Sequence, residues 1–124
     1  MIGRQLMEMV GLDPNHYVNK NDLLIDKAHY GIWEYYESGK LHEYYKQVFE
    51  NLVSGLNIIL IHPAYDDNEM QGITVNHPNF GSKWRQIDFE SFTSKEIEAR
   101  VKSNDIKLIT WNDIKLVEKE VRQN

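Results

Sequence analysis

An uninterrupted aliphatic run at residues 58–61 lies between Gly55 and Pro63. A strand with one face in water alternates apolar with polar residues, and this run does not alternate. It therefore predicts a strand over residues 57–61 that is buried on both faces, as strands of parallel sheets are. A second aliphatic run predicts another strand over residues 106–110, parallel to the first.

Apolar residues spaced three and four positions apart predict helices along much of the chain. These helices are expected near residues 3–10, 30–52, 94–103 and 113–121. In the second helix the apolar stripe should form a core face, and it comprises Leu41, Tyr44, Tyr45, Val48, Phe49 and Leu52. A break is expected there near Ser38 and Gly39. Thr93 and Glu96 have the spacing of a capping box, which predicts the start of the third helix.

The order of these elements predicts the fold class. A strand, a helix and a parallel strand make one right-handed crossover, so the chain is expected to be α/β. Parallel strands that alternate with helices are typical of a (β/α) barrel, but two strands are too few to close one. We therefore expect a partial, barrel-like fold. Residues 66–85 are polar and show no clear period, which is typical of a binding or lid loop.

Composition narrows the class of protein. The chain has 124 residues, 41% of them hydrophobic and 27% charged, as in an ordinary globular domain. A net charge of -5 without a basic run argues against binding to nucleic acid or anionic membranes. The longest apolar run is far shorter than the about 20 residues that cross a bilayer. No signal peptide is recognised, and the absence of cysteine excludes disulfides and a thiolate nucleophile, so a cytoplasmic location is expected.

Polar side chains follow the predicted strand 57–61 directly. His62 ends the strand, and Asp66 comes four residues later. Ligands bind at the carboxyl ends of parallel strands, so these groups are well placed for chemistry. The alternative is that His62 only satisfies a loop carbonyl and Asp66 caps a turn. Trp84 beside Arg85 suits a planar or anionic group, but equally a surface cation–π pair.

Other aromatic and histidine residues are interpreted more simply. Tyr30, Trp33, Tyr35 and Tyr36 form a cluster that suits sugar stacking, although their helical spacing favours packing in the core. His16 and His29 are expected to be surface or hydrogen-bonded histidines.

Several segments together resemble the YdjC-like (ChbG/HpnK-type) carbohydrate deacetylases. The matching residues are a helix that ends at Gly55, the strand at 58–61, and the segments His-Pro-Ala-Tyr-Asp-Asp-Asn-Glu (62–69), Trp-Arg-Gln-Ile-Asp-Phe (84–89), Phe-Thr-Ser (92–94) and Ile-Lys-Leu-Ile-Thr-Trp (106–111). Each segment alone is a weak signal, whereas their order and spacing are more specific. The resemblance covers nearly the whole chain and is most specific over residues 52–114.

This resemblance implies a function and also a missing part. Such proteins have an incomplete or distorted (β/α) barrel and use one divalent metal, Mg or Zn, to remove an acetyl group from an N-acetylated sugar. Their metal site lies in the amino-terminal half, in an Asp-Asp-Phe-Gly stretch and two histidine motifs that this chain lacks. Residues 1–124 are therefore expected to form a single segment like the carboxyl-terminal half, with no metal bound by this chain alone and no activity by itself.

The same resemblance implies roles for individual residues. His62 is expected to be the catalytic acid or the oxyanion stabiliser. Arg85, Trp84 and Asp66 are expected to bind substrate or to hold the loop and His62 in place. The expected partners are an N-acetylated sugar and either the missing half or a second copy of the chain. The alternative is a free-standing, non-catalytic module that binds sugar or oligomerises.

Overall fold

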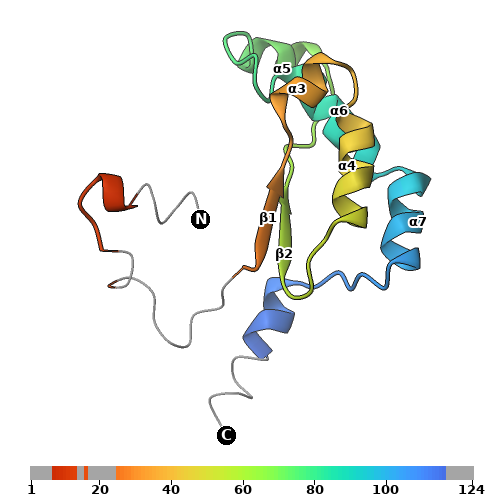
Figure 1. The fold of residues 1–124 in the computed structure, drawn as a ribbon. Helices are drawn as coiled ribbons and strands as arrows, with labels where there is room; N and C mark the ends of the chain where they lie inside the picture. The colour runs from red at the N-terminus through yellow and green to blue at the C-terminus, as the bar shows by residue number, and fades with distance from the viewer. Residues whose placement is uncertain (1–6, 14–15, 17–24, 117–124) are drawn as a thin grey trace, which may run out of the picture. The chain divides into compact units, whose positions relative to one another are not determined.

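The structure is a computed structural model that describes residues 7–13, 16 and 25–116. The chain divides into two compact units, Ile25–Leu108 and a second made of Met1–Leu24 with Ile109–Asn124. We describe each unit by itself. The elements of Ile25–Leu108 follow in the order β1 (Lys27–Tyr30), α3 (Trp33–Glu37), α4 (Leu41–Glu50), β2 (Asn57–Leu60), α5 (Asn68–Ile73), α6 (Ser82–Phe92) and α7 (Lys95–Ser103) (Figure 1).

The sheet consists of β1 and β2, which pair in parallel with His29 opposite Ile59. Helices α3 and α4 connect the two strands, so the unit contains one crossover of the α/β type. The strand predicted at 57–61 is confirmed as β2. Its partner was predicted wrongly, since it is β1 and not residues 106–110.

Residues 106–110 have no strand structure. The main-chain N–H of Ile106 donates to the carbonyl of Val101 at 3.1 Å, so the chain here completes the end of α7. Leu108 is exposed, and no strand in the described part of the chain forms hydrogen bonds with this segment. Aliphatic composition alone does not make a strand, because an extended segment also needs a partner for its backbone hydrogen bonds.

The prediction that β2 is buried on both faces is also wrong. Successive residues of a strand point to opposite faces, so the register places His29 and Ile59 on one face and Tyr30 and Leu60 on the other. Ile59 packs against the hydrophobic core, with α4 beside β2 (Figure 1). On the outer face Tyr30 is 45% exposed and Leu60 is 49% exposed. The described residues therefore cover one face of the sheet.

The helical stripe predicted from residue 41 onward is confirmed. Its members Leu41, Tyr45, Val48 and Phe49 are buried in α4. The predicted helix over 30–52 is divided, because Tyr30 belongs to β1 and the chain breaks after α3. The break falls at Gly39, whose φ of 70° lies in the left-handed region that favours glycine.

Helix α7 is confirmed, but its start was predicted one residue too early. Ser94 is the N-cap, and its hydroxyl accepts a hydrogen bond from the N–H of Ile97 at 3.2 Å. Thr93 instead ends α6, where its hydroxyl donates to the carbonyl of Phe89 at 2.7 Å. Adjacent Thr and Ser offer two caps of the same chemistry, and packing selects between them.

The region predicted as a long loop, residues 66–85, contains all of α5 and the start of α6. Asp67 caps α5 by accepting a hydrogen bond from the N–H of Met70 at 2.9 Å. Helix α6 has no apolar stripe, because it buries Asp88 and Ser91 beside Trp84. A search for apolar periodicity misses a helix whose inner face is partly polar.

Among the described residues of the other unit, helical structure occurs at residues 7–9, at residue 16 and at residues 111–116. Residues 7–9 and 111–116 overlap the helices predicted at 3–10 and 113–121, whose remaining residues lie partly outside the described ones. Thr110 precedes the stretch at 111–116, and its N–H and hydroxyl donate to the carboxylate of Asp113 at 2.7 and 2.8 Å. Across the described residues, no helix has the length and apolar character needed to span a membrane.

The hydrophobic core joins α4, α6 and α7. Its buried members are Leu41, Tyr45, Phe49, Trp84 and Ile97. Gly31, directly after β1, lies against two of them. A Cβ atom at Gly31 would lie 2.6 Å from Cζ2 of Trp84 and 2.7 Å from the hydroxyl of Tyr45. The end of β1 can therefore approach the core only because residue 31 has no side chain.

We expect Gly31→Ala to lower the free energy of unfolding by about 1–3 kcal/mol, because the added methyl group overpacks the core. The matched control is Gly72→Ala in α5, where a Cβ meets no atom within 4 Å. That substitution should stabilise the protein by about 0.5–1 kcal/mol, because alanine favours a helix more than glycine does. Urea denaturation of both variants measures the difference. A Gly31→Ala protein as stable as the parent would contradict this packing.

Candidate functional site

The candidate site lies at the carboxyl end of β2 and is built around the buried carboxylate of Asp88. Asp88 is 0% exposed. Its Oδ1 accepts a hydrogen bond from the hydroxyl of Tyr45 at 2.5 Å, and its Oδ2 accepts one from the main-chain N–H of His62 at 2.8 Å. The carboxylate of Asp88 on α6 therefore binds Tyr45 of α4 and also His62, which lies two residues after the end of β2.

Burial changes the pKa of this group. It raises the pKa of Asp88 above 3.8, although the hydrogen bonds from Tyr45 and from the N–H of His62 favour the ionised carboxylate and oppose the rise. Burial together with Asp88 also raises the pKa of Tyr45 far above its usual range. The phenol is therefore a permanent donor to Asp88.

His62 has a fixed backbone and an uncommitted side chain. Its imidazole packs on Phe80, with the ring centroids 4.4 Å apart. The Nδ1 atom is buried and forms no hydrogen bond with the described residues. Nδ1 of His62 therefore does not bond to a loop carbonyl of the described residues, as the alternative interpretation would require of a ring nitrogen.

The loop after His62 is attached to the neighbouring helices. The N–H of Ala64 donates to the carbonyl of Arg85 at 3.2 Å, and the N–H of Asp66 donates to Oε1 of Gln86 at 2.8 Å. The side chain of Gln71 donates to the carboxylate of Asp66 at 2.9 Å, and this bond lowers the pKa of Asp66. The carboxylate of Asp66 is thus bonded to Gln71, and within the described residues no hydrogen bond joins it to His62.

The other two residues expected to bind substrate lie on α6. Nε of Arg85 donates to the carbonyl of Phe80 at 2.7 Å, so its guanidinium holds the segment that precedes this helix. Trp84 is 1% exposed and packs against Trp33 and Tyr36, with ring centroids 6.2 and 4.8 Å away. Packing in the core is therefore confirmed for these two members of the aromatic cluster. Substrate contacts by Arg85 and Trp84 stay predictions.

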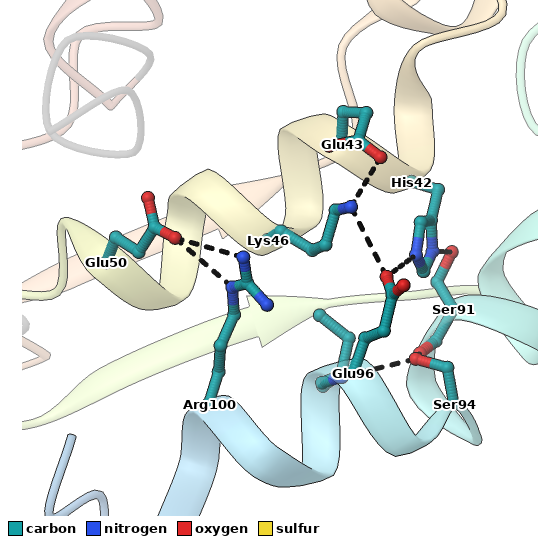
Figure 2. A network of polar contacts seen from close by, with 9 residues as sticks. His42, Glu43, Lys46, Glu50, Ser91, Ser94, Glu96 and Arg100 are labelled. Carbon is teal, nitrogen blue, oxygen red and sulfur yellow. Dashed lines mark hydrogen bonds and ion pairs between the residues drawn. The ribbon is translucent and has the colours of Figure 1, made fainter. Parts of the chain in front are cut away.

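A second polar network, which the sequence did not reveal, joins α4, α6 and α7 (Figure 2). His42 lies between Ser91 and Glu96, with Nδ1 2.9 Å from the Ser91 hydroxyl and Nε2 2.9 Å from the Glu96 carboxylate. Lys46 forms ion pairs with Glu43 and Glu96. The hydrogen bond from His42 and the ion pair with Lys46 lower the pKa of Glu96. His42 is about 50 residues from its partners in sequence, so no local motif could have indicated the contact.

Serine, histidine and carboxylate in hydrogen-bonded order also occur in enzymes with a serine nucleophile. Ser91, however, is 1% exposed and lies inside α6, where its carbonyl accepts a hydrogen bond from the Ser94 hydroxyl at 2.7 Å. A nucleophile must reach the carbon that it attacks, and Ser91 is almost fully buried, with its hydroxyl bonded to His42. The network therefore ties three helices together.

Metal ligands do not converge in the described part of the chain. Within residues 7–13, 16 and 25–116, no group of three or more His, Asp or Glu side chains is placed to hold a metal ion. His29 is buried in β1, so it is not a surface histidine. A side-chain hydrogen bond with Asn57 partly offsets the burial that lowers its pKa, whereas its Nε2 makes no hydrogen bond with a described residue. His16 is exposed, as expected.

Comparisons with known proteins add no relative. No protein-family model matches the chain, and no curated protein matches it. The resemblance to carbohydrate deacetylases therefore rests on the motifs in the sequence.

Asp88→Asn tests the buried carboxylate. The amide cannot accept from both Tyr45 and His62, so one donor loses its partner and the free energy of unfolding should fall by about 1–3 kcal/mol near neutral pH. The folded state binds the Asp88 proton more tightly than the unfolded state. The contribution of Asp88 to stability is therefore greatest below pH 3.8 and decreases as pH rises through its raised pKa.

The stability difference between the parent and Asp88→Asn should accordingly decrease with rising pH above 3.8. Urea denaturation at a series of pH values measures it. Asp66, Glu96 and Glu98 have lowered pKa values and act in the opposite direction, but both proteins contain them, so they cancel in the difference. The control is Glu90→Gln, an exposed carboxylate on the same helix. A pH-independent difference would contradict the raised pKa of Asp88.

Proposed function

We propose that this chain is the carboxyl-terminal part of a metal-dependent hydrolase that removes acetyl groups from N-acetylated sugars or oligosaccharides. The family resemblance is to YdjC-like carbohydrate deacetylases, and the proposal includes their partial (β/α) barrel. The observation that supports it best is His62. Its backbone is held by a buried carboxylate at the carboxyl end of a parallel strand, while Nδ1 of its partly buried imidazole has no hydrogen bond to the described residues.

This combination suits acid–base chemistry. Amide hydrolysis requires an activated water, a base, and a group that stabilises or protonates the tetrahedral intermediate. An imidazole on a fixed backbone loses little entropy when it meets the acetyl carbonyl or the leaving nitrogen. His62 would therefore act as the general acid or as the oxyanion donor.

In this proposal the divalent metal, Mg or Zn, is bound by the amino-terminal half that residues 1–124 lack. The described residues of this chain do not form a ligand set for it, so we assign no step of the reaction to a metal here. Arg85 can hold the segment before α6 through Nε and still direct the rest of its guanidinium toward substrate. Asp66 would act by fixing the loop after His62. Trp84 would act from the core, by supporting the residues around His62.

The alternative function is a non-catalytic module that binds sugar or oligomerises. The outer face of the sheet favours association, because Tyr30 and Leu60 are uncovered there and parallel sheets are usually covered on both faces. That face would contact the missing half or a second copy of the chain. In both cases we propose a cytoplasmic location without nucleic-acid or membrane partners.

His62→Ala tests the catalytic assignment in a protein that carries the metal-binding segment together with residues 1–124. We expect kcat for acetate release from an N-acetylated chitooligosaccharide to fall about 10²–10³-fold, because an acid or oxyanion donor is lost. Metal content and melting temperature should stay close to those of the parent, since the substitution keeps the main-chain N–H that Asp88 binds.

The control is His77→Ala, which removes an exposed imidazole from the segment between α5 and α6 and should leave kcat unchanged. A purely structural role for His62 predicts a lower melting temperature with near-normal kcat. That result in a folded His62→Ala protein would reject the catalytic assignment.

Metal affinity is a separate prediction. A stable catalytic site usually needs at least three protein ligands, so residues 1–124 alone should bind no zinc or magnesium stoichiometrically. Calorimetric titration of the isolated chain with each ion should show weak binding only. Submicromolar, one-to-one binding of either ion would show that this chain contains its own site.

A further inference from the structure

Phe80 has a backbone conformation that phenylalanine rarely adopts. Its φ is 60°, in the left-handed region that favours glycine. The other non-glycine residue with a positive φ in the described part of the chain is Asp105, and a short polar side chain tolerates this region better than an aromatic one. Such strain persists only where the contacts of the residue outweigh it. The contacts of Phe80 must therefore explain its conformation.

Three contacts hold Phe80 in place. Its carbonyl accepts a hydrogen bond from Nε of Arg85 at 2.7 Å, and a charged donor makes a stronger bond than a neutral one. Its ring packs on Trp84, with the ring centroids 4.7 Å apart. The same ring packs on the imidazole of His62, with the centroids 4.4 Å apart and an angle of 41° between the planes. The strained residue is thus held between the core and His62.

Arg85 connects Phe80 to the loop that follows His62. Its side chain bonds to the carbonyl of Phe80, and its own carbonyl accepts the N–H of Ala64 at 3.2 Å. Arg85 therefore fixes two segments, the one that carries the ring of Phe80 and the one that leaves His62. Because the N–H of His62 is bonded to Asp88, the backbone on which the imidazole turns is fixed as well.

An aromatic contact can orient an imidazole without using its nitrogens. A hydrogen bond to a ring nitrogen also orients the ring, but that nitrogen is then occupied. His42 is oriented in this second way, since both of its nitrogens are bonded within the protein. At His62 the ring packs on Phe80, while Nδ1 forms no hydrogen bond with the described residues. Packing thus restricts the ring and leaves this nitrogen available.

We infer that Phe80 is a positioning residue for the imidazole of His62, and that Arg85 holds Phe80 in this position. The inference rests on the proposed function, in which His62 is the general acid or the oxyanion donor. Phe80 acts only through His62, by limiting its ring to one orientation. A proton donor held in one orientation needs less reorganisation at the moment of reaction.

The test is ¹³C NMR relaxation of the histidine rings in the full chain, with the His62 signal identified by its loss in His62→Ala. Rigid groups have order parameters of about 0.85 and flexible ones below about 0.6. Phe80→Gly removes the aromatic ring and also relieves the strain at a φ of 60°, so the protein should stay folded. We expect the order parameter of the His62 ring to fall from about 0.85 to below about 0.6.

Two further variants separate the ring of Phe80 from its backbone anchor. Phe80→Tyr keeps an aromatic ring and should restore the order parameter of the parent. Arg85→Lys keeps the positive charge but lacks the Nε donor, so it should lower the order parameter of the His62 ring as Phe80→Gly does. The matched control is Phe89→Ala, which removes a partly buried ring that packs on Tyr65, and the His62 ring should then stay ordered.

Activity gives the second readout, in the protein that carries the metal-binding segment. Phe80→Gly should lower kcat about 10–10²-fold, because a misplacement of about 1 Å can cost about 10²-fold. KM should stay within about twofold of the parent, because Phe80 does not bind substrate.

A purely structural role for Phe80 predicts a lower melting temperature, with the His62 ring still ordered and kcat near normal. Either an ordered His62 ring or an unchanged kcat in folded Phe80→Gly would overturn the inference and leave the assignment of His62 intact. Near-normal kcat in His62→Ala would instead reject the proposed function, whatever the relaxation data show.

Discussion

The structure of residues 25–108 depends on one interaction, the double hydrogen bond to the buried carboxylate of Asp88. A carboxylate without water is unfavourable unless donors surround it. Tyr45 and the N–H of His62 supply those donors from α4 and from the end of β2. The carboxylate of Asp88 on α6 has both hydrogen bonds only when Tyr45 and the N–H of His62 are in place. It therefore selects one arrangement of α4, α6 and β2. The core packs around this arrangement, with Gly31 as its closest approach.

His42 and His62 lie in two different polar environments. His42 uses both ring nitrogens within the protein, to Ser91 and to Glu96, and so ties three helices together. The main-chain N–H of His62 is held by Asp88, and its ring packs on Phe80 while Nδ1 has no hydrogen bond to the described residues. The partners of His42 lie about 50 positions away in sequence, whereas the loop after His62 is held to α6 through the N–H groups of Ala64 and Asp66. A ligand site requires this second kind of environment, with a fixed support and unsatisfied side chains.

The wrong predictions share a physical cause. Residues 106–110 have the composition of a strand but no partner, and β1 has a partner but not the composition, since Lys-Ala-His-Tyr contains no aliphatic run. Backbone pairing decides between such segments, and it depends on the fold as a whole. Helix α6 was missed because its inner face carries Asp88 and Ser91, which are buried through hydrogen bonds and not through apolarity.

The sequence by itself determined the elements whose information is local. The stripe of α4, the break at Gly39, strand β2 and the position of His62 at its end all follow from periodicity or from one residue's backbone preference. Only the tertiary structure decided that β1 is the partner of β2, that Ser94 and not Thr93 caps α7, and that Asp88 holds His62. Each of these is a choice between chemically similar groups. Contacts between residues far apart in the chain make the choice. Such contacts stabilise the protein only after the helices and strands have packed together.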